Sequence, residues 1–169
     1  ICVNLEVNRF TYIIRFLMTS VASFLLFLLF SQPAWSLCVM SDVANLRSVP
    51  GVQYKKTWTV GKYMPLLKVG EKSGWYKVVD LDGESHWISS SLVTTRVKCL
   101  VVSSRKSILR SGPGTHFSNA SYKQADKYTP FKRVTKKEAW YHVSDVEGNR
   151  FWIHESNIWR PVRVSNISF

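Results

Sequence analysis

The chain contains the same short module twice, and this internal repeat restricts its fold more than any other feature of the sequence. Residues 61–93 and 126–158 are identical at 13 of 33 positions without a gap. The earlier segment Ala44–Gly51 returns as Ser107–Gly114 at an offset of 63 residues instead of 65, so the second copy carries a two-residue insertion in between. A duplication of this kind predicts two small domains with one common fold rather than a single large domain.

The segment before the repeat has the composition of a targeting sequence. Arg9 and Arg15 precede a mostly apolar run over residues 16–30, and small residues occupy positions −3 and −1 of a cleavage site after Ser36. A basic flank, an apolar run shorter than ~18 residues and such a site are typical of a secretory signal peptide. We therefore predict a signal peptide over residues 1–36 and a secreted or periplasmic protein. The alternative is an uncleaved membrane anchor, for which the run is short.

The rest of the chain is expected to form a first module over residues 37–97, a second module over residues 98–159 and a basic tail over residues 160–169. Loss of the signal peptide removes two arginines and one glutamate, which lowers the formal net charge from +12 to +11. A chain this basic attracts anionic partners. Because domains of about 60 residues are only marginally stable alone, packing between the modules or a covalent link is expected to help.

Two cysteines remain after the signal peptide. Cys38 and Cys99 each precede the first expected strand of a module by a few residues. In an oxidising envelope such an even pair predicts a disulfide that ties the start of one module to the start of the other. Closing a loop of this length stabilises a fold by at most ~4 kcal/mol on the chain-entropy model. The alternative is a pair of free thiols.

Within each module the pattern is one of short strands separated by turns, and no helical periodicity occurs after residue 37. The first expected strand contains Leu46 or Leu109, and a loop of about a dozen residues follows it. Later, Asp82-Gly83 and Glu147-Gly148 predict tight hairpin turns. About five short strands, one long loop and a polar turn before the last strand predict an all-β fold, in which each module is a small, strongly bent barrel.

These residues resemble the bacterial SH3-like domains. Members of that family typically open with Ala-Asn-(Leu/Val)-Arg-x-Gly-Pro-Gly and later carry Gly-x-Trp-x-x-Val and Asp-Gly-x-x-Gly-Trp-(Ile/Val). The second module matches the opening at Leu109–Thr115, whereas the first keeps Ala44–Arg47 but has Val49 in place of glycine. His86 and Phe151 stand where the family has a glycine before the last tryptophan.

The resemblance covers residues 37–159 and implies two tandem SH3-like β-barrels after the signal peptide. It is specific for the fold and weak for any one ligand. In such barrels the peptide groove lies between the long first loop and the later hairpin, so aromatic and arginine side chains there become candidates for ligand contact. Plain packing of the aromatic residues is the competing interpretation. Arg47 and Arg110 either clamp a carboxylate or hold the Pro-Gly loop that follows them. The candidate ligand-binding residues are Arg47, Tyr54, Tyr63, Trp75, Trp87, Arg110, Phe117, Tyr128, Trp140 and Trp152.

The sequence gives no indication of catalysis, metal binding or a cofactor. The string Asp80–Gly83 lacks the further acidic ligands of a calcium loop and is better explained as a hairpin turn. The four histidines have no metal-type spacing, and His86, His142 and His154 are expected on surfaces or at strand ends. Neither cysteine has the sequence context of a nucleophile, and the repeats leave no room for a separate catalytic domain.

The leading hypothesis is therefore a non-catalytic secreted binding protein that recognises cell-wall peptide (peptidoglycan) or another anionic envelope ligand. Stem peptides carry free carboxylates, which a basic, aromatic-rich surface attracts. The alternative is a periplasmic adaptor that binds another protein. Export argues against nucleic acid as a partner, although the composition is basic and aromatic. Membrane contact is expected only through an uncleaved signal.

Overall fold

The computed structural model describes residues 35–161, apart from the side chains of residues 121–123. The predicted signal peptide, except for Trp35 and Ser36, and the tail after Pro161 lie outside the described residues. Within the described part the chain forms strands and two short 3-10 segments, and none of its helical segments is long and apolar enough to cross a membrane. The described residues all belong to one compact unit.

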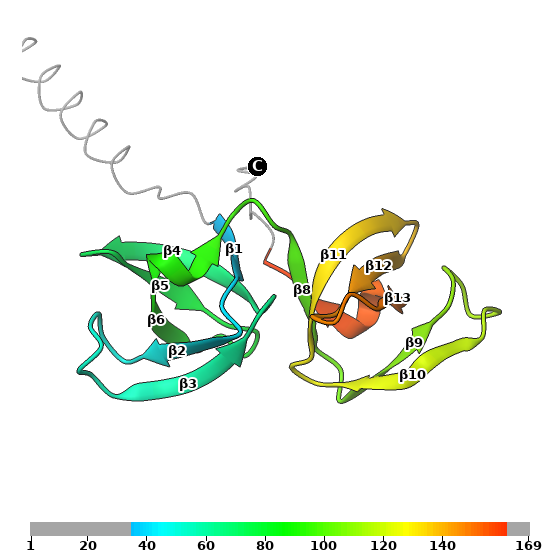
Figure 1. Ribbon diagram of the computed structural model, residues 1–169, viewed down its shortest axis with the longest axis horizontal. Coiled ribbons are helices and arrows are strands. Elements are labelled where there is room, and N and C mark those ends of the chain that lie inside the picture. Colours follow the sequence, from blue (N-terminus) through cyan, green and yellow to red (C-terminus); the bar gives the residue numbers. More distant parts are fainter. Residues whose placement is uncertain (1–34, 162–169) are drawn as a thin grey trace, which may run out of the picture. The chain divides into compact units, whose positions relative to one another are not determined.

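The first module is a sheet of seven antiparallel strands with the order β3-β2-β6-β5-β4-β1-β7. Figure 1 shows how the long strands of this sheet bend so that the sheet curls over its own core. A 3-10 turn, η1 (Ser90–Leu92), leads into the last short strand. The strands are β1 (Trp35–Val39), β2 (Val43–Arg47), β3 (Lys56–Gly61), β4 (Pro65–Lys72), β5 (Trp75–Val79), β6 (Ser85–Ser89) and β7 (Val93–Thr94).

The second module repeats this arrangement strand for strand, in the order β10-β9-β13-β12-β11-β8-β14. The 3-10 turn η2 (Glu155–Asn157) again precedes the last strand, and here His154 caps it by accepting a hydrogen bond from the Ser156 backbone N–H. The strands are β8 (Cys99–Val102), β9 (Lys106–Arg110), β10 (Asn119–Asp126), β11 (Pro130–Lys137), β12 (Trp140–Ser144), β13 (Arg150–His154) and β14 (Ile158–Trp159).

Alternation along the strands explains why each module folds this way. In β2 the side chains of Ala44 and Leu46 are buried while Asn45 and Arg47 are not, and β9 shows the same period of two. The inward-facing aliphatic and aromatic residues of each sheet form one hydrophobic cluster per module. The hairpins between β5 and β6 and between β12 and β13 turn at Gly83 and Gly148, which have φ of 85° and 91° and therefore favour glycine.

The all-β class and the two tandem SH3-like barrels predicted from the sequence are confirmed. Each barrel has seven strands rather than about five, because two segments expected to be irregular are strands. The long first loop contains β3 or β10, which pairs with the strand before it, and the cysteine segments are themselves strands β1 and β8. β1 begins at Trp35, and Trp35 and Ser36 pair with Lys68 and Leu67. Cleavage after Ser36 would remove both of these pairs.

The predicted disulfide between Cys38 and Cys99 is present. It does not join equivalent positions of the repeat: Cys38 pairs with Pro65, whereas Pro130, the counterpart of Pro65, pairs with Val101. Cys99 therefore corresponds to Ser36, two residues before Cys38. Both cysteine side chains are buried, and Val101, from the second module, packs in the hydrophobic cluster of the first. The covalent link and this packing join the first strands of the two modules.

Candidate functional site

The surface of the second module carries a groove of about 380 Å³ with a cationic and aromatic lining and no carboxylate. Strand β9 supplies one side of the groove. Lys106, Ile108 and Arg110 alternate along it with the buried Ser107 and Leu109, so their side chains share the outer face of the strand. The remaining lining residues are Thr115 from the loop after β9, Trp140, His154 and Asn157.

The aromatic side of the groove comes from the β12–β13 hairpin. Trp140 and His154 are directly opposite each other in the antiparallel register, and their rings meet edge to face with centroids 5.1 Å apart. His154 also contacts the Ser156 hydroxyl through Nδ1 at 2.8 Å, which fixes the orientation of its ring. An aromatic platform beside two cations fits an extended peptide with free carboxylates, since the cations attract the carboxylates and the rings pack against apolar parts of the peptide.

The equivalent surface of the first module has the same tryptophan and arginine but less charge. Val43, Asn45 and Arg47 stand in β2 where Lys106, Ile108 and Arg110 stand in β9. Ser89 replaces His154 beside Trp75. The first module therefore keeps one cation of the two and has no second ring beside its tryptophan. The two copies share a fold but differ in the chemistry of this surface.

The two arginines of the repeat hold the loops that follow them. Arg47 donates through Nη1 to the carbonyl oxygen of Tyr54 at 2.6 Å, and Arg110 donates to that of Phe117 at 2.7 Å. These hydrogen bonds match the structural role considered for the arginines. Each guanidinium has five N–H donors, so the bond to the loop leaves others for a carboxylate in the groove.

Arg110 and Trp140 are the predicted ligand-binding residues that the groove of the second module brings together. Trp87 and Trp152 lie on the strands next to the arginines, opposite Arg47 and Arg110 in the register. Ligand contact by any of the ten predicted residues stays a prediction. The sequence reasoning missed Lys106, Ile108 and His154, although the alternation of Lys106, Ile108 and Arg110 was a readable signal for the first two.

Tyr63 and Tyr128 lie outside this groove, at the turns that follow β3 and β10. Both have a positive φ, 68° and 71°, in the left-handed region that side chains other than glycine rarely adopt. Tyr128 donates from its hydroxyl to Asp82 Oδ2 at 2.6 Å, and its ring meets that of Trp58 edge to face. Lys127 forms an ion pair with the same carboxylate at 2.7 Å. Hydrogen bonds from Lys127 and Tyr128 lower the pKa of Asp82.

His86 is the second residue of β6 and is buried, so it lies near a strand end but not on a surface. Its Nε2 lies 3.2 Å from Asp80 Oδ2, and its Nδ1 lies 2.9 Å from the Thr57 hydroxyl. Because a carboxylate only accepts, Nε2 donates to Asp80 and Nδ1 accepts from Thr57 when the imidazole is neutral. Asp80 is itself buried and also accepts from the backbone N–H groups of Asp82 and Glu84, which shapes the β5–β6 turn.

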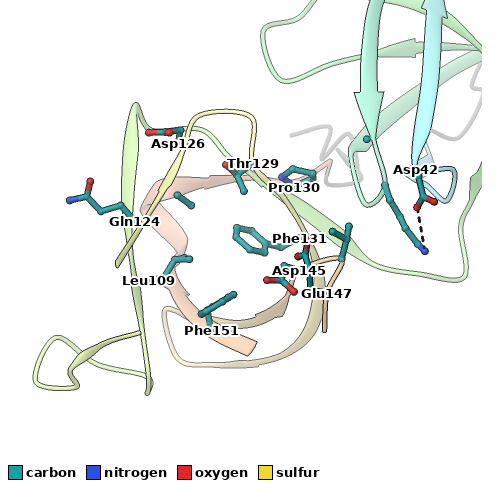
Figure 2. A pocket seen from close by; sticks show the side chains of 14 residues that line it. Asp42, Leu109, Gln124, Asp126, Thr129, Pro130, Phe131, Asp145, Glu147 and Phe151 are labelled. Carbon is teal, nitrogen blue, oxygen red and sulfur yellow. Dashed lines mark ion pairs between the residues drawn. The ribbon is translucent and has the colours of Figure 1, made fainter. Parts of the chain in front are cut away.

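A larger pocket, of about 690 Å³, has the opposite charge (Figure 2). Its apolar floor is the open end of the second module's core, where Leu109, Phe131 and Phe151 point inward among the strands. Lys62 is the cation of its lining and pairs with Asp42 at 3.8 Å. The acidic rim makes this pocket unsuited to the anionic ligands that the groove fits. The other carboxylates of the lining are Asp126, Asp145 and Glu147.

Among residues 35–161 no cluster of three or more histidine, cysteine or carboxylate side chains is arranged to hold a metal ion. The hydroxyl, imidazole and carboxylate of Thr57, His86 and Asp80 do form a connected series. The carboxylate of this series is tied to two backbone N–H groups of a turn, which gives the series a structural role in the hairpin.

Comparison with known proteins identifies the family of the chain. The model of the bacterial SH3 domain family matches residues 40–94 and 104–160, and the chain belongs to that family. No curated protein matches the chain. Solved structures that are similar to it include NlpC1 and NlpC2 from Trichomonas vaginalis, with 11% and 12% identity and TM-scores of 0.34 and 0.33. They match over 77% and 78% of this chain but 47% and 50% of their own, so the chain spans about half the length of these proteins.

His142 gives the second module a predicted pH dependence. Its ring stacks on Trp152 with centroids 4.7 Å apart, and burial, aided by the nearby charge of Arg150, lowers the pKa of His142 below 6.5. The unfolded chain therefore binds a proton at higher pH than the folded chain does. We expect the contribution of His142 to the free energy of unfolding to be fully present above pH 6.5. This contribution is lost as the pH falls through the pKa of His142 in the folded chain, which is the lower of the two.

Urea titrations between pH 7.5 and 5 measure this effect as a falling free energy of unfolding. The variant His142→Gln is expected to flatten this part of the profile, because it removes the titrating group. A profile that stays as steep in the variant would assign the pH dependence to other groups.

Proposed function

We propose that this protein is a non-catalytic, exported binding protein and that the groove of its second module recognises a carboxylate-bearing peptide of the cell envelope, with the peptidoglycan stem peptide as the first candidate. Membership of the bacterial SH3 domain family supports a binding role. The single observation that carries the proposal is the groove itself, which places Lys106 and Arg110 beside the paired rings of Trp140 and His154 without any acidic side chain.

We assign the main binding site to the second module because its groove carries more positive charge. Arg110 does not distinguish the two modules, since Arg47 occupies the equivalent position in the first. Lys106 and His154 are the additions of the second module, where the first has Val43 and Ser89. Lysine adds a permanent positive charge, and histidine adds a ring that widens the aromatic platform. The function is therefore assigned to the second module, with the first as a weaker homologous site.

The repeat supplies a matched pair of variants for testing this assignment. We expect Trp140→Ala to weaken retention of the full chain on purified peptidoglycan by about 30-fold, because an aromatic side chain at the centre of a site contributes on the order of 2 kcal/mol. Trp75→Ala removes the same side chain at the same strand position of the first module and is expected to change retention by less than about threefold. Both are measured in co-sedimentation assays with the chain in a nonionic detergent.

The exchange Lys106→Val gives the second module the residue of the first and tests the electrostatic part of the proposal. It should weaken binding and reduce its dependence on salt, because one attractive charge is lost. Equal effects of Trp75→Ala and Trp140→Ala would contradict the assignment to the second module. If the unmodified chain is not retained on peptidoglycan, the proposal that it binds the cell wall is wrong. That result would favour the alternative, a periplasmic adaptor that binds another protein.

A further inference from the structure

A third pocket, of about 410 Å³, lies beside the disulfide and is separate from the groove. Lys98, Arg133 and Arg160 contribute three positive charges to its lining, which contains no carboxylate. Cys99 and Trp35 also line it, and 42% of the Trp35 surface is exposed. Within residues 35–161, none of the three cations forms an ion pair, whereas Lys62, Lys68, Lys127 and Lys136 each do.

One buried ring positions the two guanidinium groups. Tyr141 is 1% exposed, and the guanidinium carbons of Arg133 and Arg160 lie 5.3 and 5.7 Å from its centroid. Attraction between a cation and the face of an aromatic ring restrains both side chains without using their N–H donors. The backbone N–H of Arg133 donates to the carbonyl oxygen of Lys98 at 2.8 Å, which brings the third cation to the same place. The positive charges are thus held before any anion arrives.

The first module shows that this cluster is not a consequence of the fold. Tyr76 corresponds to Tyr141, and Lys68 lies over its ring with Nζ 4.1 Å from the centroid, as Arg133 does in the second module. There, however, Glu71 neutralises the cation at 2.6 Å, and Thr95 stands in the place of Arg160. The second module has Lys136 where the first has Glu71.

Glu155, which the charge of Arg160 reaches, does little to compensate this positive charge. Glu155 is paired with Lys136 at 2.7 Å, and the charge of Arg160 contributes only a minor part of the lowered pKa of Glu155. Glu155 therefore neutralises Lys136 rather than the three cations of the pocket. Two arginines and a lysine around one pocket match the phosphate group, because the planar guanidinium binds two phosphate oxygens at once.

The surroundings favour a phosphate that belongs to a lipid. Trp35 stands at the edge of the pocket, and tryptophan beside lysine and arginine is the combination typical of a membrane–water interface. In the sequence, the apolar run that ends at Phe30 precedes Trp35 by five residues, a length of chain that reaches at most about 18 Å. A membrane that holds this run is therefore within reach of the pocket.

We propose that the pocket formed by Lys98, Arg133 and Arg160 beside Trp35 binds the phosphate of an anionic phospholipid headgroup and so holds the second module at a membrane surface. The site is independent of the peptide groove, since the two share no lining residue. Because Trp35 precedes the predicted cleavage site, the proposal applies to the full chain.

The test uses the full chain in nonionic detergent micelles that contain phosphatidylglycerol, with the phosphorus NMR resonance of the lipid as the readout. We expect saturable binding that Arg133→Gln weakens by at least about tenfold, through loss of a charged hydrogen-bond donor pair. Lys132→Gln is the matched control: it removes the same charge from an exposed neighbour in β11 that does not line the pocket, and it should change affinity by less than about twofold.

Circular dichroism checks that each variant is folded, and Arg160→Gln, after the last strand, repeats the test if Arg133→Gln does not fold. Equal weakening by Lys132→Gln would overturn the proposal, because binding would then reflect diffuse charge. Absence of saturable binding would also overturn it. The same binding measurement is repeated with micelles that contain phosphatidylcholine and with inorganic phosphate in solution. Binding of either as tight as that of phosphatidylglycerol would overturn the assignment to an anionic lipid.

Discussion

Reducing the Cys38–Cys99 disulfide is expected to lower the free energy of unfolding by about 4 kcal/mol. The bond joins residues separated by 61 positions, and the loop it closes contains strands β2 to β7 of the first barrel. In the unfolded chain such a link removes many conformations, and the chain-entropy relation gives about 4 kcal/mol for a loop of this length. The disulfide restricts the native state much less than the unfolded chain, because β1 and β8 are already held together by the packing of Val101 in the first module's core.

Urea denaturation of the oxidised and the reduced chain, without any change of sequence, measures this quantity. The double variant Cys38→Ala/Cys99→Ala provides a second measurement and should resemble the reduced chain, apart from the cost of two small cavities. It also controls for side effects of the reductant. A difference of less than about 1 kcal/mol between the oxidised and reduced chains would show that β1 and β8 stay together in the unfolded state by other means.

The repeat made most of the architecture predictable. Two copies of one pattern fixed the number of modules. Leu46 and Leu109, expected in the first strand of each module, lie in β2 and β9 and are buried. Strand β3 was missed although Thr57, Trp58, Thr59 and Val60 alternate between polar and apolar residues. Four such residues between a Pro-Gly turn and a lysine-tyrosine turn are too short a signal to separate a strand from a loop, and pairing with β2 decides the outcome.

The candidate sites were less predictable, because they depend on contacts between residues far apart in the sequence. Arg110 and Trp140 follow from the family pattern. The cluster of Lys98, Arg133 and Arg160 spans three separate elements, and no local spacing indicates that one buried tyrosine gathers two of them. Differences between the copies were more informative than similarities. A replacement of Glu71 by Lys136 at equivalent positions reverses the local charge and is visible in the sequence once the repeat is aligned.

His86 is a residue important for stability whose contacts, like those of the candidate sites, join residues from different elements. The family glycine is replaced by histidine in the first module and by Phe151 in the second. Histidine is intermediate among residue types in its tendency to be buried, so its presence in a strand predicts neither burial nor exposure. Here the β5–β6 hairpin brings it back to Asp80, six residues earlier, and β3 brings the Thr57 hydroxyl to its other nitrogen. Neither contact has a sequence signature, so burial of this side chain was not foreseen.

Replacing Asp80 with alanine is expected to lower the free energy of unfolding by about 3 kcal/mol. The carboxylate accepts three hydrogen bonds, from His86 and from the backbone N–H groups of Asp82 and Glu84, and it is 5% exposed. Its removal leaves the buried Nε2–H of His86 without an acceptor, although Nδ1 keeps its contact with Thr57, and an unpaired buried donor costs more than an equivalent loss at the surface.

The second module again provides the control. Asp145 occupies the equivalent position, but within residues 35–161 its carboxylate accepts hydrogen bonds from the backbone and side chain of Asn149 and none from a buried histidine, and it is less buried. Asp145→Ala should therefore cost about 1 kcal/mol. Urea denaturation followed by tryptophan fluorescence measures both variants, since Trp58 packs near His86 and Trp152 lies in the second module. Equal losses for the two aspartates would show that the contact with His86 contributes nothing.

The double variant Asp80→Ala/His86→Phe distinguishes a missing partner from a missing carboxylate. It places phenylalanine where the second module already has Phe151, so the first module no longer buries an imidazole. If the unpaired Nε2–H of His86 is the main cost of Asp80→Ala, the double variant should regain about half of the lost stability, because removing both members of a buried polar pair costs less than removing one. No recovery would mean that the two backbone hydrogen bonds of the turn account for the stabilisation by Asp80.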